Sequence, residues 1–125
     1  MAGCASEIYI PDRGHIVLLN FHPGKGDETG KRRPALVLSS LAYNQTLGQA
    51  ICIPISSKSK KRPAYVEITG LATDPSYAIP GLIRALDWRQ RKAEFVSITD
   101  DATYREAILK LLPLIGAEKI FAQLC

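Results

Sequence analysis

The stretch that decides the fold covers residues 25–39 and reads KGDETGKRRPALVLS. Its two glycines permit a loop that bends freely, and Pro34 disfavours a helical conformation at Arg33. The alternation of Leu36 and Leu38 with other side chains then predicts a strand. Glu28 and Arg33 are therefore held at the mouth of a strand. A guanidinium that forks onto phosphate oxygens and a carboxylate that moves a proton favour phosphodiester chemistry, and the alternative is an ordinary surface ion pair.

Short apolar runs separated by Gly, Pro and Asn predict further strands on both sides of this segment. A turn or a single helical turn is expected at residues 43–48. Pro54, near the end of one of these runs, suits a bulge or an edge. The expected strands cover residues 15–21, 34–40, 49–55, 64–69 and 82–88.

The last third of the chain changes period. Apolar residues from 104 to 115 recur at helical spacing, with Asp100 and Asp101 available as N-caps. Pro113 should shorten or kink this helix, and Gly116 can end it, leaving an apolar tail that contains Ile120, Phe121 and Leu124. We therefore predict one domain over residues 1–125. It is mainly β with a C-terminal helix, as a small antiparallel barrel or curled sheet on which the helix packs.

The charge of the chain is uneven. The formal net charge is +4 and the isoelectric point is about 9.1. Residues 13–92 contain 13 Lys or Arg and 5 Asp or Glu, whereas the two ends contain 3 basic and 7 acidic residues. Any polyanion should therefore bind to the middle of the chain.

The cysteines and histidines are not spaced as a metal or redox site would require. The three cysteines are far apart in sequence, and the two histidines, His15 and His22, lie at opposite ends of one expected strand. We expect no metal and no cofactor. Cys52 reads as a core residue, and the chain, which has no apolar run of membrane-spanning length, is expected to be soluble and cytoplasmic.

A basic loop follows the third expected strand. Ser56 and Ser57 open it, so hydroxyl groups and a positive field could meet on one side of the sheet. The alternative is a solvated hairpin tip. Its cations, with Arg84, Arg89, Arg91 and Lys92 elsewhere, could line a groove for a phosphate backbone, and Tyr43, Tyr65, Tyr77 and Trp88 could stack unpaired bases. Trp88 could equally lie in the core or in a dimer interface. The cations of the loop are Lys58, Lys60, Lys61 and Arg62.

Several motifs recur in the order seen in one protein family. They are YIPDRG at 9–14, NF with Pro23, Gly26, Glu28, Gly30, RPALVLS at 33–39, YN at 43–44, PISS at 54–57 and LDWRQR at 86–91. Over about residues 8–116 the chain thus resembles the MazF/PemK family of toxin endoribonucleases. The resemblance implies an SH3-like barrel that forms a homodimer, cleaves single-stranded RNA at short sequences without a metal ion and is neutralised by an acidic antitoxin.

The resemblance also implies roles for single residues. Arg33 would serve in acid/base work and stabilise the charged phosphorane, Ser56 would contact the scissile phosphate, and Glu28 would support the site or act as base. The substrate's own 2′-hydroxyl would be the nucleophile, and the products would carry a 2′,3′-cyclic phosphate and a 5′-hydroxyl. Further RNA contacts are expected from Asp27, Lys31, Arg32, Ser57, Lys58, Lys60, Lys61, Arg62 and Arg84.

The chain departs from the family pattern at Gly81 and Leu82, where many members carry an Asp-Gln pair, so a side chain that often contacts RNA is missing. Two alternatives therefore stand beside the nuclease. One is a CcdB-like toxin of the same fold that binds a protein target such as DNA gyrase. The other is a degenerate, non-catalytic RNA-binding barrel.

Overall fold

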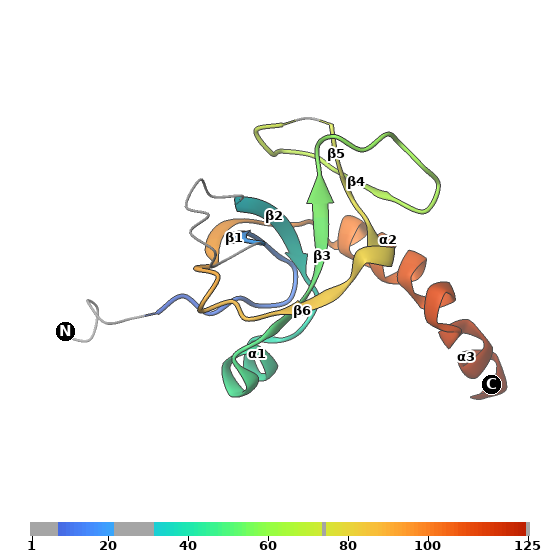
Figure 1. The fold of residues 1–125 in the computed structure, drawn as a ribbon. Helices are drawn as coiled ribbons and strands as arrows, with labels where there is room; N and C mark the ends of the chain where they lie inside the picture. The colour runs from blue at the N-terminus through green and yellow to red at the C-terminus, as the bar shows by residue number, and fades with distance from the viewer. Residues whose placement is uncertain (1–7, 22–31, 74, 125) are drawn as a thin grey trace.

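A curled antiparallel sheet forms the body of the molecule (Figure 1). The computed structural model describes residues 8–21, 32–73 and 75–124. Three α-helices are α1 (Leu41–Leu47), α2 (Asp101–Leu111) and α3 (Ala117–Leu124), and two short 3-10 helices are η2 (Pro80–Leu82) and η3 (Leu112–Ile115). The strands are β1 (His15–Asn20), β2 (Arg32–Val37), β3 (Ala50–Ser56), β4 (Val66–Ile68), β5 (Ser76–Ala78), β6 (Arg84–Leu86) and β7 (Glu94–Ile98).

Strand β3 sets the curl, because it changes partner along its length. The sheet runs in the order β4-β5-β3-β2-β1-β7, with β6 paired to β3 beside this path. The end of β3 at Ile55 and Ser56 pairs with β5, whereas its beginning, Ala50 to Cys52, pairs with β6. The predicted class, a mainly β antiparallel barrel-like sheet with a C-terminal helix, is confirmed.

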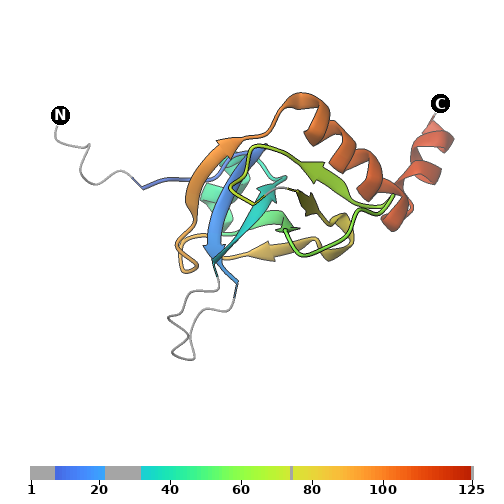
Figure 2. The same ribbon diagram turned by 90° about the horizontal axis from the view of Figure 1, so that it is seen from above.

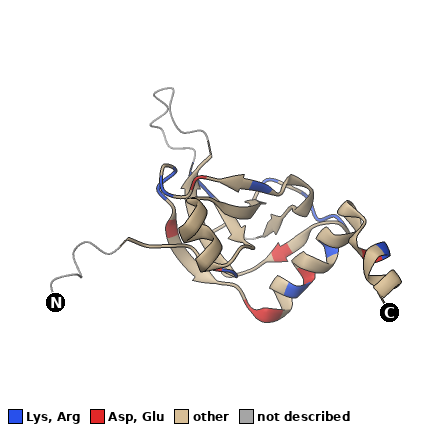
Figure 3. Ribbon diagram, turned by 90° about the horizontal axis from the view of Figure 1, so that it is seen from below, with Lys and Arg blue, Asp and Glu red and all other residues tan. Residues whose placement is uncertain are grey.

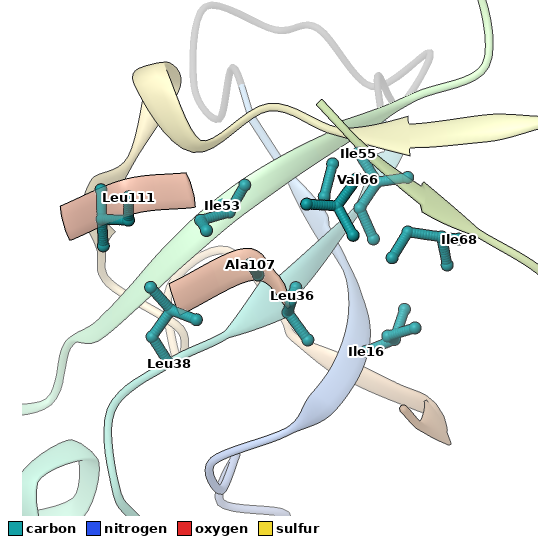
Figure 4. Packing of buried hydrophobic residues seen from close by; sticks show 10 residues of the cluster. Ile16, Leu36, Leu38, Ile53, Ile55, Val66, Ile68, Ala107 and Leu111 are labelled. Atoms are coloured by element: carbon teal, nitrogen blue, oxygen red, sulfur yellow. The ribbon is translucent and has the colours of Figure 1, made fainter. Parts of the chain in front are cut away.

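Two apolar clusters fill the two sides of the sheet. In the first, α2 lays Ala107 and Leu111 onto the sheet (Figure 4). The second lies under β6 and the segment after it, and it holds Cys52 with no exposed surface. The alternation of β2 explains the division, since Leu36 belongs to the first cluster while Ala35 and Val37 belong to the second. The remaining sheet residues of the first cluster are Ile16, Leu38, Ile53, Ile55, Val66, Ile68 and Ala78.

Trp88 is a core residue. Its side chain is 2% exposed, and its indole Nε1 donates a hydrogen bond of 2.9 Å to the carbonyl oxygen of the buried residue Asn44. Of the three placements considered for Trp88, the core is therefore the right one, and the ring is available neither to a base nor to a second copy of the chain. The Arg89 guanidinium lies 4.9 Å from the Trp88 ring centroid.

The caps of the C-terminal region are where the sequence predicts them. The Asp100 carboxylate accepts from the Thr103 backbone N–H at the start of α2, and Gly116, with φ of 74°, ends η3, which contains Pro113. The predicted apolar tail is instead the helix α3, which continues beyond α2 at the end of the molecule (Figure 2). No helix of the described part is long and apolar enough to cross a membrane.

Three strands differ from the prediction. The expected strand over 82–88 shrinks to β6, because η2 occupies Pro80–Leu82. Strands β5 and β7 were not predicted at all. Strand β5 has three residues, too few to show a period, and β7 is an edge strand on β1 with no side chain fully buried.

Candidate active site

A cavity of about 490 Å³ opens where β2 begins and β3 ends. Antiparallel pairing brings these points together, since Pro34 of β2 lies opposite Leu18 of β1, and Ala35 lies opposite Pro54 of β3. The segment that is expected to carry the chemistry runs into β2, and the basic loop follows β3. Their adjoining ends therefore meet at one opening. The cavity is lined by Leu18, Arg32, Arg33, Pro34, Ile55, Ser57, Lys58, Leu71, Ala72, Thr73 and Val96.

Arg33 lines this opening and is exposed. It lies in extended backbone before Pro34 and opposite Leu19 of β1. Its guanidinium makes no hydrogen bond to another described residue, and an arginine side chain stays charged in any protein environment. The group is therefore available to an anionic ligand, with Lys58 on the same cavity adding positive charge.

Arg32 is committed to the protein itself. Its Nη2 atom lies 3.2 Å from the Leu18 carbonyl oxygen, 2.8 Å from the Lys92 carbonyl oxygen and 3.0 Å from Oε1 of Glu94, and its Nη1 donates to Oδ1 of Asn20 at 3.1 Å. These contacts fasten the start of β2 across β1 to the beginning of β7. Arg32 lines the cavity, but its charge is largely used for this clamp, a role that the sequence did not reveal.

Replacement of Arg32 by alanine should lower the free energy of unfolding by about 2 kcal/mol. The loss follows because the Leu18 and Lys92 carbonyl groups lose a charged donor, whereas the ion pair with Glu94, which is 69% exposed, contributes little. Urea unfolding at one protein concentration measures it. The control is Arg105→Ala on the exposed face of α2, expected within about 0.5 kcal/mol of the parent. Equal midpoints for both variants would contradict the clamp.

The two adjacent serines occupy different positions. Ser57 lines the cavity, whereas Ser56 does not, and the Ser56 hydroxyl accepts a hydrogen bond of 3.2 Å from the Lys58 backbone N–H. Ser56 pairs with Tyr77 of β5. Of the two serines, Ser57 is thus the one that lines the cavity with Arg33.

The basic loop is divided between two places. Lys58 lines the cavity beside Arg33, but Lys61 and Arg62 line a second cavity on the side of β4 and α2, and Lys60 lines neither. Arg84 is not among the residues that line the cavity with Arg33, and its guanidinium lies 5.6 Å from the ring centroid of Phe21. The remaining predicted contacts, Asp27, Glu28 and Lys31, lie outside the described residues.

Arg91, one of the cations expected in a groove, and His15 both have structural partners. Arg91 donates from Nη1 to the carbonyl oxygens of Asn20 and Phe21, at 3.1 and 2.7 Å, and so fixes the end of β1. Nδ1 of His15 lies 2.7 Å from the Tyr9 hydroxyl oxygen, and the two rings stack. His15 is therefore part of the scaffold.

Cys52 is not a nucleophile in this structure. Burial raises the pKa of its thiol to about 12, so the group stays protonated at neutral pH. The described residues contain no group of three His, Cys, Asp or Glu side chains placed to hold a metal ion. The polar groups that the described residues bring to the cavity belong to arginine, lysine, serine and threonine.

One wall of the cavity was missed by sequence reasoning. Leu71, Ala72 and Thr73 line it, and the Ser76 hydroxyl group holds this wall through the Thr73 carbonyl oxygen. Val96 of β7 lines another side. The run of residues 94–98, with two β-branched residues and a phenylalanine, is a strand signal that could have been used, whereas nothing in residues 71–73 marks a site.

Comparison with known proteins agrees with this architecture. The family model described as the PemK-like, MazF-like toxin of type II toxin-antitoxin systems matches residues 12–115. Endoribonuclease toxin MazF of Escherichia coli K12 is 36% identical over 85 residues, 68% of this chain and 76% of that protein. Endoribonuclease toxin ChpB of the same strain is 32% identical over 114 residues, 83% of this chain and 93% of its own.

Solved structures give the same result. The crystal structure of MazF from Deinococcus radiodurans superposes with a TM-score of 0.75 at 39% identity, covering 87% of this chain and 99% of its own. The MazE-MazF complex from that organism gives 0.75 at 38% identity, with 87% and 98% covered. An endoribonuclease solved with its cognate antitoxin from a mycobacterial species, at 17% identity and 0.67, shares the fold. The chain therefore belongs to the PemK-like, MazF-like toxin family of type II toxin-antitoxin systems.

Proposed function

We propose that this chain is a toxin endoribonuclease that cuts single-stranded RNA at selected short sequences without a metal ion and acts in the cytoplasm. The observation that carries the proposal is the exposed residue Arg33 at a cavity that Ser57 and Lys58 also line. A permanently charged planar fork beside a hydroxyl and a second cation suits a phosphodiester whose charge grows during reaction. Relatives at 32–36% identity that are named endoribonucleases support the same activity.

The reaction needs no nucleophile from the protein. The 2′-hydroxyl oxygen of the RNA attacks the neighbouring phosphorus while Glu28, the proposed base, takes its proton. Arg33 holds the phosphorane oxygens, and Ser57 donates a hydrogen bond to the same group. The bond from phosphorus to the 5′ oxygen then breaks and that oxygen takes a proton from solvent water, leaving a 2′,3′-cyclic phosphate and a 5′-hydroxyl.

Incubation of the purified protein with a long RNA in excess EDTA tests the proposal. Primer extension should map cuts at a small set of short sequences, and the products should carry 5′-hydroxyl ends. A requirement for an added divalent ion would overturn the metal-independent mechanism. RNA binding without any cuts would favour the degenerate, non-catalytic barrel. No described feature specifically favours the other alternative, a toxin that binds a protein target such as DNA gyrase.

We expect an acidic antitoxin to inhibit by covering Arg33 and the loop over residues 58–62. Solved MazE-MazF complexes of similar proteins support such a partner. Because exposed cations dominate this surface, the dissociation constant of the complex should rise with salt. Fluorescence anisotropy from 50 to 500 mM NaCl measures it. Cleavage that continues unchanged in the saturated complex would show that inhibition does not act by occlusion.

We also infer a homodimer, on a narrower basis than the sequence suggested. Trp88 is buried and β3 is central in the sheet, so neither can form the interface. One group of exposed apolar side chains follows α2 in η3 and α3, and its members are all more than half exposed: Leu114, Ile115, Ile120, Phe121 and Leu124. Light scattering should give about twice the 13.7 kDa of one chain. A mass of one chain at micromolar concentration would contradict the dimer.

A further inference from the structure

A second cavity, of about 460 Å³, is separate from the one that Arg33 lines. The loop between β3 and β4 supplies Lys61 and Arg62, the sheet supplies Glu67 and Tyr77, and α2 forms the remaining side. Charges of both signs gather where this loop and β4 meet α2 (Figure 3). None of the groups used in the proposed reaction lines this cavity, so it requires an explanation of its own.

The wall of this second cavity is built by specific bonds. The Tyr65 backbone N–H donates to the Arg62 carbonyl oxygen at 3.0 Å, which closes a turn that contains Pro63. Lys110 of α2 donates from Nζ to the Tyr65 carbonyl oxygen at 2.8 Å, and Glu106 lies 2.9 Å from the same ammonium group. The turn is thereby fastened to the helix, and the charge of Lys110 is neutralised within the protein.

The groups that remain match the parts of a nucleotide. Lys61 and Arg62 are exposed cations that suit a phosphate. Tyr65 is half-buried and offers a ring on which a base can stack. Glu67 is exposed, lies two residues further along the chain and accepts hydrogen bonds only, as an exocyclic amino group of a base requires. An acidic peptide fits less well, because it would meet the carboxylates of Glu67 and Glu106.

The two cavities are close enough for one RNA strand. Lys58 lines the first cavity and Lys61 lines the second. Because these residues are three positions apart in the chain, their Cα atoms lie at most about 11 Å from each other. Ser56, next to Ser57 of the first cavity, pairs with Tyr77 of the second. We propose that the second cavity binds one nucleotide of the RNA outside the cleaved dinucleotide, and that it selects a base with an exocyclic amino group. This inference rests on the proposed nuclease function.

Abasic substrates test the proposal with the full-length protein. In a cleavable RNA oligonucleotide, the bases outside the cut dinucleotide are removed one at a time, and kcat/KM is measured for each substrate. With the parent protein, one position should lose about tenfold, within the range that stacking of a single base contributes. Tyr65→Ala should lose about as much on the intact RNA and show no further loss at that abasic position. Tyr65→Phe, which keeps the ring, should retain the parent pattern.

Two exposed positions keep the test valid if Tyr65→Ala fails to fold. Glu67→Gln, whose amide also donates, should reduce the preference against uracil at the identified position. Lys61→Gln should raise KM severalfold, whereas the charge-matched change Arg105→Gln on the exposed face of α2 should leave it unchanged. Variants that show the parent's abasic pattern and base preference would overturn the site. Variants that bind the antitoxin more weakly but cut RNA like the parent would also overturn it. That result would assign the cavity to the protein partner. A parent protein that cuts no RNA would contradict the proposed function, and the second site with it.

Discussion

An RNA in which the nucleotide before the cut bond carries 2′-deoxyribose is expected to resist cleavage at that bond completely. The proposed reaction takes its nucleophile from the substrate, so a single hydrogen in place of that hydroxyl removes the attacking atom. The described protein residues offer no substitute at the cavity, since Cys52 is buried with a pKa raised to about 12 and the Ser57 hydroxyl has no described histidine or carboxylate lining the same cavity. Denaturing gel electrophoresis of end-labelled RNA measures the effect.

A second oligonucleotide controls for altered binding. It carries the same deoxyribose one nucleotide further from the cut bond, where the hydroxyl takes no part in the reaction, and it should be cut at close to the rate of the all-ribose RNA. Mass spectrometry of the products should find the 2′,3′-cyclic phosphate on the upstream fragment. Cleavage of the first oligonucleotide at the same bond would mean that water or a protein group attacks, and the mechanism proposed for this chain would be wrong.

The fold was predictable where one side of a segment is buried and the other is not. The apolar spacing of β1, β2 and α2, the N-cap at Asp100 and the left-handed Gly116 are local signals, and the structure confirms each. Strand β5, in contrast, exists because it pairs with β3 and β4, and no local pattern of three residues can report those partners. The same holds for Trp88, whose placement depends on the carbonyl group of Asn44, 44 residues earlier.

The candidate site was predictable in its chemistry but not in its division of roles. Pro34 and the residues before it marked Arg33, and the serines marked the end of β3. The sequence gives no reason to distinguish the four cations of the following loop. In the structure, Lys58 lines the first cavity, whereas Lys61 and Arg62 line the second, beside α2. Likewise, the sequence does not distinguish the role of Arg32 from that of Arg33. The contacts that commit Arg32 come from Leu18, Lys92 and Glu94, which are distant in sequence.

Replacement of Arg33 by alanine is expected to lower the single-turnover rate by about 10² to 10³, the usual effect of removing one preorganised donor from a developing oxyanion. The guanidinium is exposed at the cavity and is not held by another described residue, so its loss should barely change stability. Arg33→Lys should recover only part of the rate, because an ammonium group keeps the charge but lacks the planar fork. Ser56→Ala, Ser57→Ala and Glu28→Ala should each cost less than Arg33→Ala.

Arg32→Ala supplies the internal control for this assignment. The Arg32 guanidinium is bonded to four protein oxygens, whereas that of Arg33 makes no hydrogen bond to another described residue, so the removal of Arg32 should lower stability far more than the rate of the folded protein. Circular dichroism would establish the folded fraction of each variant before one fluorogenic RNA is used to compare rates. Equal and small losses of rate in the folded Arg33→Ala and Arg32→Ala proteins would show that Arg33 is an ordinary solvated cation. In that case the catalytic role would have to lie with residues of the segment between β1 and β2.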